Sequence, residues 1–212
     1  MIYRFHYRGH LAEEQADGWE TAVRKTKEAI AKYMTENKVM TACIYRHENM
    51  LFAYYETIGE KIEPDELFAP LENYLLKWPG EANPRNWVLM HHVYYHAMPE
   101  SVEDWKRDTK PDMRRGRIAR LKEDKLFDYV YYHVAITKEG YLSGDKYQSI
   151  GLHEDMLFSY FEEPRSHVNI CRDSSKESEV IKEWEARVPS HHFVPWPDGK
   201  SFLFIPAIID MG

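Results

Sequence analysis

A sixteen-residue segment occurs twice in this chain, and this repeat constrains the fold more than any other feature. Residues 41–56 read TACIYRHENMLFAYYE and residues 147–162 read YQSIGLHEDMLFSYFE, so the segments are offset by 147 − 41 = 106 positions. Eight of the sixteen positions are identical, and Trp78 falls on Trp184 at the same offset. The sequence therefore predicts one unit of about a hundred residues that was duplicated and fused.

The hydrophobic pattern of each copy predicts a strand, a helix, two strands joined by a hairpin, a second helix and a last strand. In the first copy these elements are expected at residues 2–8, 19–38, 41–46, 51–56, 64–78 and 87–96. In the second copy they are expected at residues 116–122, 124–138, 147–152, 156–162, 177–187 and 202–209. The order is that of the ferredoxin-like βαββαβ unit.

A ferredoxin-like unit places both helices on one face of its sheet, so the other face needs a partner. A second copy in the same chain provides one. We therefore expect an α+β protein in which two tandem ferredoxin-like repeats form an intramolecular dimeric α/β barrel. The repeats are expected at residues 1–98 and 114–212, joined by a linker at residues 99–113 that contains Pro99 and Pro111.

The composition is that of a folded protein and argues against some partners. Hydrophobic residues make up 43% of the 212 positions, which is enough for a sizeable core. The net charge of −7 disfavours nucleic acid and anionic membranes as partners. A small-molecule substrate is the expected partner, and the chain is expected to be a monomeric pseudo-dimer or a homodimer.

The N-terminal residues contain no apolar run of the signal-peptide kind, and no stretch is long enough for a membrane span. A cytoplasmic location is expected. Cys43 and Cys171 are the two cysteines, and without a CxxC motif they are expected to be reduced and structural. The histidines show no zinc-like spacing with other ligands, so no metal site is predicted.

Residues 115–133 read RGRIARLKEDKLFDYVYYH, and this stretch resembles the start of the L-rhamnose mutarotase family. That family has a strand, a Leu-Lys-x-x-Lys stretch and then a helix with a Tyr-x-x-x-His pair. Tyr147 and the LFSYFE segment at residues 157–162 resemble its next two strands. The similarity covers nearly all of the second copy and is fainter in the first.

The resemblance implies an enzyme that interconverts the anomers of a deoxyhexose or related monosaccharide without a cofactor. It implies that His133 is the proton donor and that Tyr129, Tyr147 and Trp184 bind the sugar. The residues are compatible with this, since Tyr129 and His133 lie one helical turn apart and an imidazole can give or take a proton near neutral pH. Aromatic rings can cover the apolar face of a sugar.

The chain departs from the family pattern at several positions. Thr137 and Lys138 replace the family's Trp-Pro, and Glu185 replaces the second residue of its Trp-Trp pair. Tyr129, His133 and Trp184 also have a simpler interpretation as core residues on the inner faces of amphipathic helices. Two alternatives to the mutarotase therefore stay open: a sugar-binding module that lacks catalysis, and a cofactor-free or haem-using monooxygenase of the same fold.

The predicted strand at residues 87–96 supplies further site candidates. Strict alternation would place His92, Tyr94 and His96 on one face of this strand and His91 on the other, so either face brings a histidine near the interior. We name His92, Tyr94 and His96 as additional substrate-binding candidates. They can equally pair with backbone groups or with Glu56 and Glu162.

Overall fold

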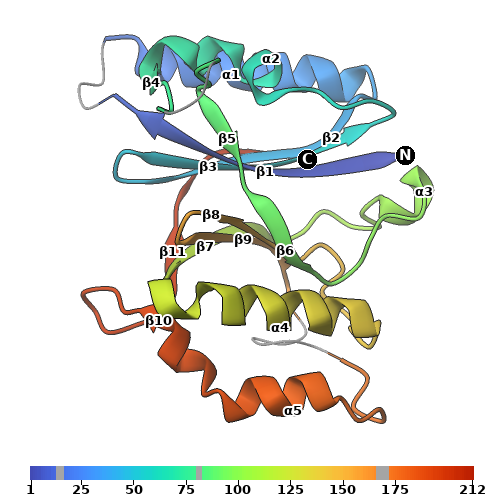
Figure 1. Ribbon diagram of the computed structural model, residues 1–212. Coiled ribbons are helices and arrows are strands. Elements are labelled where there is room, and N and C mark those ends of the chain that lie inside the picture. Colours follow the sequence, from blue (N-terminus) through green and yellow to red (C-terminus); the bar gives the residue numbers. More distant parts are fainter. Residues whose placement is uncertain (13–16, 80–82, 166–171) are drawn as a thin grey trace. The chain divides into compact units, whose positions relative to one another are not determined.

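The computed structural model describes residues 1–12, 17–79, 83–165 and 172–212, and its chain is traced in Figure 1. Cys171 therefore lies outside the described residues. The chain forms two compact units. Unit 1 comprises Met1–Met90, Pro99–Lys110 and Ile205–Gly212, and unit 2 comprises His91–Met98 and Pro111–Phe204.

Unit 1 has an antiparallel sheet with the strand order β12-β2-β3-β1-β4, and β5 also pairs with β1. The helices α1 and α2 lie on one side of this sheet (Figure 1). Its elements are β1 (Ile2–Leu11), α1 (Trp19–Thr35), β2 (Val39–His47), β3 (Met50–Ile58), α2 (Pro64–Leu67), the 3₁₀ helix η1 (Ala69–Tyr74), β4 (Leu75–Leu76), β5 (Trp87–Leu89), α3 (Val102–Trp105) and β12 (Ala207–Met211).

Unit 2 repeats this arrangement with the strand order β10-β7-β9-β8-β6, and β11 also pairs with β7. Its helices α4 and α5 lie on one side of the sheet (Figure 1). The elements are β6 (His91–Tyr95), β7 (Met113–Leu121), η2 (Glu123–Lys125), α4 (Leu126–Glu139), β8 (Ser149–His153), β9 (Met156–Glu163), α5 (Glu179–Ala186), η3 (Pro189–His192), β10 (Phe193–Val194) and β11 (Leu203–Ile205).

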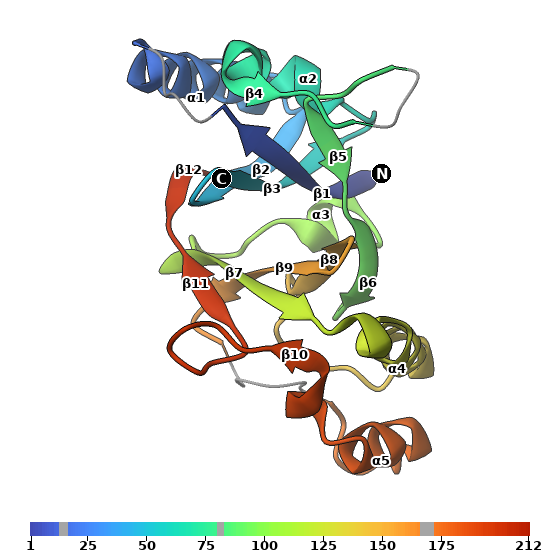
Figure 2. The ribbon, with the colours of Figure 1, turned by 60° about the vertical axis from the view of Figure 1, so that its left-hand side comes forward.

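The last strand of each repeat is split, which corrects the two continuous strands expected at residues 87–96 and 202–209. In the first repeat, β5 pairs with β1 of its own repeat, whereas β6 pairs with β8 of the second repeat. In the second repeat, β11 pairs with β7 and β12 pairs with β2 of the first repeat (Figure 2). Each compact unit is therefore completed by a strand from the other sequence repeat.

The predicted hairpins are confirmed and have the same geometry in both copies. Each has a two-residue loop, in which Glu48 has φ 50° and Glu154 has φ 54°. These are left-handed backbone conformations of the kind that tight two-residue hairpin loops require. The sixteen-residue sequence repeat thus corresponds to a repeated structure.

Three of the four predicted helices are confirmed with shifted ends, and one expectation was wrong. The helix expected at residues 64–78 consists of the short α2 and the 3₁₀ helix η1, and Trp78 lies beyond both. Pro70 explains the break, because proline lacks the N–H that an α-helix needs at this point. In the second copy, Ser178 caps α5 by accepting a hydrogen bond from the Ile181 backbone N–H at 3.0 Å.

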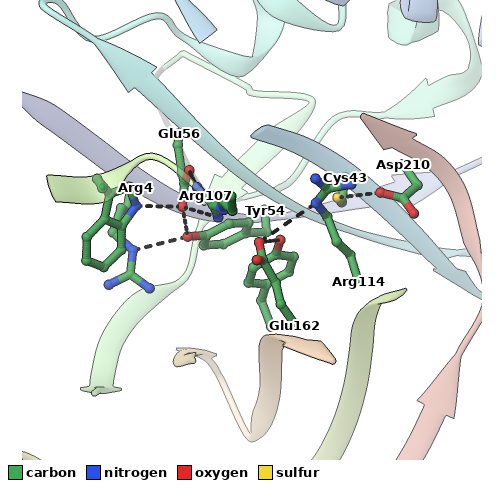
Figure 3. Close-up of polar contacts among 10 residues, drawn as sticks. Arg4, Cys43, Tyr54, Glu56, Arg107, Arg114, Glu162 and Asp210 are labelled. Atoms are coloured by element: carbon green, nitrogen blue, oxygen red, sulfur yellow. Dashed lines mark hydrogen bonds and ion pairs between the residues drawn. The ribbon is translucent and has the colours of Figure 1, made fainter. Parts of the chain in front are cut away.

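The buried carboxylate of Glu56 in unit 1 forms hydrogen bonds through both of its oxygens (Figure 3). Arg107 contacts both oxygens of Glu56, at 2.6 and 3.0 Å, and Trp105 Nε1 donates to the same carboxylate at 2.9 Å. The Tyr54 hydroxyl donates to Glu56 at 2.5 Å. The Arg107 charge holds the pKa of Glu56 below its usual range despite burial, so this network ties the segment after β6 to strand β3 as an ion pair.

The fold is α+β, with two ferredoxin-like units in one chain. No helix in the described part of the chain is long and apolar enough to cross a membrane.

Candidate functional site

Unit 2 contains a cavity of about 1090 Å³. This is a volume that accommodates an organic ligand. The cavity is bordered by the sheet, by both helices and by the segments that follow β9 and α5. Its lining residues all belong to unit 2: Tyr94, Asp112, Arg117, Tyr129, His133, Gln148, Ile150, Phe161, Glu163, Pro164, Arg165, Arg172, Ile181, Trp184, Glu185, Pro189, Ser190, Phe193, Lys200, Ser201, Phe202 and Phe204.

The helical wall of the cavity follows from side-chain spacing. Tyr129 and His133 are four residues apart on α4, and Ile181 and Trp184 are three residues apart on α5. Side chains at these spacings share one face of a helix. Each pair therefore points to the same side of its helix, and the two pairs meet where the Trp184 ring packs edge-on against His133 at a centroid distance of 5.0 Å.

His133 has a defined tautomer. Its Nδ1 lies 2.9 Å from the Tyr129 carbonyl oxygen, and because a carbonyl only accepts, Nδ1 must carry the proton. Burial lowers the pKa of His133 to about 4, although the hydrogen bond to Tyr129 opposes this shift. At neutral pH the ring is therefore uncharged, and Nε2 holds a lone pair that can take a proton.

Tyr129 stacks on the His133 ring with a centroid distance of 3.7 Å and an interplanar angle of 19°. Burial raises the pKa of the Tyr129 hydroxyl, while the charge of Arg117 acts in the opposite direction. The hydroxyl thus remains protonated at neutral pH. It has no hydrogen-bond partner within the described residues, so it is available as a donor to a ligand.

Next to this helical wall, the buried His192 contacts Asp128. His192 Nε2 lies 2.9 Å from Asp128 Oδ2, and the His192 ring packs 4.6 Å from Trp184. The neighbouring His192 adds electrostatically to the lowering of the His133 pKa. This pair joins α4 to η3 and so fixes the position of Trp184 beside the cavity.

Two guanidinium groups border the cavity from the sheet side. Arg117 lies over the Phe202 and Phe161 rings, at 4.3 and 5.5 Å from their centroids. Arg165 lies 4.2 Å from the Phe161 centroid and donates to Gln148 at 3.0 Å. Burial and, after it, the Arg165 charge lower the pKa of Arg117 to about 10, and burial also lowers the pKa of Arg165. Both groups stay charged at neutral pH.

The structure brings four of the predicted site residues to one cavity and leaves three away from it. Tyr94, Tyr129, His133 and Trp184 line the cavity. Tyr147 lies in a turn before β8, where Gln148 takes the lining position. His92 is exposed and His96 is buried, and neither borders the cavity. The expected alternation along this strand was wrong, because the register shifts between His92 and Tyr94.

Neither Arg117 nor Arg165 was predicted from the sequence as a site residue. A signal for Arg117 was present in strand β7, where Arg115, Arg117, Ala119 and Leu121 alternate on one face. Since Ala119 and Leu121 belong to the core of unit 2, Arg117, the arginine next to them on this face, borders the interior. No comparable pattern surrounds Arg165, which lies in the segment after β9.

No family model matches this chain, and no curated protein matches its sequence. The rhamnose mutarotase family is therefore not returned by either comparison. Within residues 1–12, 17–79, 83–165 and 172–212, no group of three or more His, Cys, Asp or Glu side chains is arranged to hold a metal ion.

Several solved structures are similar over nearly the whole chain. A proposed monooxygenase from Lactobacillus acidophilus has a TM-score of 0.45 and 8% identity, covering 99% of this chain and 95% of its own. A proposed monooxygenase from Fusobacterium nucleatum has a TM-score of 0.46 and 10% identity, covering 99% and 93%. A proposed chlorite dismutase has a TM-score of 0.41 and 15% identity, covering 97% and 94%. At this level the likeness says nothing about the chemistry of this chain.

Proposed function

We propose that unit 2 is the substrate-binding half of a small-molecule enzyme and that His133 acts as a general base. The observation that carries this proposal is the state of His133 in the wall of the cavity. Its Nδ1 proton is committed to the Tyr129 carbonyl, and its pKa of about 4 keeps Nε2 unprotonated at neutral pH. An imidazole in this state accepts a proton from a bound substrate.

The reaction that best suits such a base is deprotonation of a planar, weakly acidic organic molecule. A histidine with a pKa of about 4 is a weak base, so the substrate anion that it creates must be stabilised by other groups. Arg117 and Arg165 supply positive charge at the same cavity, and Tyr129 supplies a hydroxyl donor. Phe161, Phe202 and Trp184 supply flat apolar walls.

Cofactor-free oxygenation is one reaction that begins in this way. The base removes a proton from an aromatic substrate, and the electron-rich anion that remains passes an electron to O₂. The residues of the cavity would hold the substrate, take the proton at His133 Nε2 and stabilise the anion. No metal is needed for these steps.

Interconversion of sugar anomers, which the family resemblance implies, is less well supported by the same residues. That reaction needs an acid to protonate the ring oxygen as well as a base. His133 is unprotonated at neutral pH, because burial lowers its pKa to about 4, and burial raises the pKa of Tyr129. Tyr147, one of the expected sugar contacts, does not line the cavity.

A haem-using reaction is the second candidate, and the tautomer of His133 favours it. With Nδ1 bonded to a backbone carbonyl, Nε2 is the nitrogen left to bind iron. Arg117 and Arg165 would hold the propionate groups. Haem would supply the redox chemistry for activating O₂. A Soret shift on addition of haemin, lost in His133→Phe, tests this candidate.

The base role can be tested with 5-nitrobenzisoxazole, a planar substrate whose ring opens when a base removes its C3 proton. The N–O bond breaks, the proton moves to the base and 2-cyano-4-nitrophenolate forms, which absorbs visible light. We expect the protein to accelerate this reaction and His133→Gln to lower kcat/KM by about 10²-fold. His191→Gln, at an exposed position outside the cavity, is the matched control and should keep wild-type rates.

Equal rates for wild type and His133→Gln, or binding of the probe without acceleration, would leave unit 2 as a binding module. Saturation-transfer NMR on the anomeric protons of L-rhamnose tests the sugar reaction in parallel. Anomer exchange that depends on His133 would favour the mutarotase over the proposed reaction.

A further inference from the structure

Arg117 carries a positive charge into the cavity without a partner for it. Within the described residues its guanidinium makes no hydrogen bond, and no carboxylate lies within 4 Å of it. The side chain is instead held over two phenyl rings, Phe202 and Phe161. Charged groups in protein interiors are ordinarily paired, so an unpaired guanidinium at a cavity wall suggests that the partner comes with the ligand.

The other cations that line the cavity have partners. Lys200 pairs with Asp198 at 2.9 Å, and Arg172 donates to the Lys176 carbonyl oxygen at 2.9 Å. Arg165 has its own partners, Gln148 at 3.0 Å and the Asp145 carboxylate at 3.9 Å. Of the lining acids, Glu163 is paired with Arg115 at 3.2 Å. Arg117 thus stands apart from the arginines at positions 114, 115, 120 and 165, each of which has a carboxylate within 4 Å.

The fold itself does not require a charge at this position. Arg117 lies opposite Ser159 in the β7–β9 pair, and the corresponding pair in unit 1 joins Tyr7 to Ala53. Ala53 and Ser159 are equivalent in the sequence repeat. Unit 1 therefore builds the same strand position with a buried aromatic side chain, which packs on Tyr55 at a centroid distance of 5.9 Å.

We infer that Arg117 is the residue that recognises an anionic oxygen of the ligand, and that the ligand of unit 2 is a planar aromatic carboxylate or phenolate. This inference rests on the proposed function in one respect, that the cavity is the ligand site. A guanidinium binds a carboxylate through two parallel hydrogen bonds and binds a phenolate through one or two. The Phe161 and Phe202 rings on which Arg117 rests also provide apolar surface for the aromatic part of the same ligand.

A pair of probes that differ only in charge tests the inference. Isothermal titration calorimetry would compare 2-naphthoate with 2-naphthamide, which has the same shape and no charge. We expect wild type to bind the carboxylate at least about tenfold more tightly, because a hydrogen-bonded charge pair contributes about 1.5–3 kcal/mol. Arg117→Gln should remove this preference while keeping the affinity for the amide within about twofold.

Two further variants separate recognition from a structural effect. Arg117→Lys keeps the charge but not the planar fork, so it should restore part of the preference for the carboxylate. Arg120→Gln is the matched control, because Arg120 lies on the same strand, pairs with Asp155 at 3.1 Å and does not line the cavity. It should bind both probes as wild type does. If Arg117→Gln fails to fold, the salt dependence of wild type replaces it: only naphthoate should lose affinity between low and high KCl.

Equal affinity of wild type for the two probes, including no binding of either, would overturn the inference. So would an Arg117→Gln protein that loses both probes alike. These failures are distinguishable from failure of the base proposal, because the charge preference does not depend on His133. A protein that prefers naphthoate through Arg117 but loses no rate in His133→Gln keeps the inference and rejects the base.

Discussion

Unit 1 and unit 2 have the same strand order, but they differ in what occupies the interior beside the helices. In unit 1 this interior is filled by aromatic side chains: Tyr55, Phe68 and Trp87 are buried and pack on one another. A Cβ atom added at Gly9 would lie 3.0 Å from the Trp87 ring, so even this position leaves no free space. Unit 2 instead contains the cavity of about 1090 Å³.

The difference comes from substitutions at equivalent positions. Tyr7 in unit 1 corresponds to Arg117 in unit 2, as judged by strand register. By the same criterion Ile209, opposite Ile44, corresponds to Tyr94, opposite Ile150. A tyrosine and an isoleucine of unit 1 thus correspond to an arginine and a tyrosine that line the cavity. This teaches that one copy of a duplicated scaffold can have a packed interior while the other has a cavity at the equivalent positions.

The helices differ in a complementary way. Helix α1 buries Ala22, Thr26 and Ile30, whereas α4 buries Tyr129 and His133 among others. Small side chains on α1 make room for the large aromatic residues of its sheet. In unit 2 the helix carries the large aromatic residues, and the sheet carries arginine.

The largest expected effect is on the free energy of unfolding when one phenyl ring is deleted from each unit. Phe68→Ala removes a fully buried ring from the packed interior of unit 1 and should cost about 4 kcal/mol of unfolding free energy. Phe161→Ala removes a ring that borders the cavity, where one side already lacks packed neighbours, and should cost about 2 kcal/mol. Urea unfolding at pH 7 measures both. Equal losses would mean that the two interiors are packed alike.

A smaller effect on the free energy of unfolding is expected when the pH is lowered, and it should depend on His133 of unit 2. Burial lowers the pKa of His133 to about 4 in the folded protein, and its ordinary value is 6.5. Between pH 6.5 and pH 4, His133 therefore binds a proton in the unfolded chain but not in the folded chain. The free energy of unfolding thus falls as the pH drops below 6.5. By pH 5 this amounts to about 2 kcal/mol.

His133→Phe removes this titration and keeps a ring in the same place. The loss of unfolding free energy between pH 7 and pH 5 should be smaller in the variant than in wild type by about 2 kcal/mol. Identical pH dependence in the two proteins would show that His133 titrates with its ordinary pKa in the folded state. His133 would then be partly protonated near neutral pH, and the protonated fraction could not act as a base.

Much of the fold could be predicted from the sequence because its signals are local. The repeated hairpin and the helices expected at residues 19–38 and 124–138 all follow from patterns of neighbouring residues, although the ends of both helices are shifted. The split of each last strand could not be predicted. The pattern of residues 87–96 does not indicate that the two halves of this strand pair with different sheets, which is decided by contacts distant in sequence.

The candidate site was predicted in part for the same reason. Tyr129 and His133 share a helix, so their spacing sufficed to place them together, and Trp184 was named from the family resemblance. His92 and His96 were expected beside Tyr94 from strict alternation, which the register shift after His92 breaks. Arg165 reaches the cavity from a segment without regular structure, and no spacing rule covers such a segment.

The central claim is that unit 2 binds a ligand in its interior and unit 1 does not, and the tryptophans report on this most directly. The chain has six, of which Trp184 lines the cavity while Trp87 and Trp105 are buried in unit 1. In a protein with ¹⁵N-labelled indoles, assigned by single Trp→Phe variants, titration with 2-naphthoate should shift the Trp184 signal and leave those of Trp87 and Trp105 unchanged. A shift at Trp87 or Trp105, or no shift at Trp184, would contradict the account.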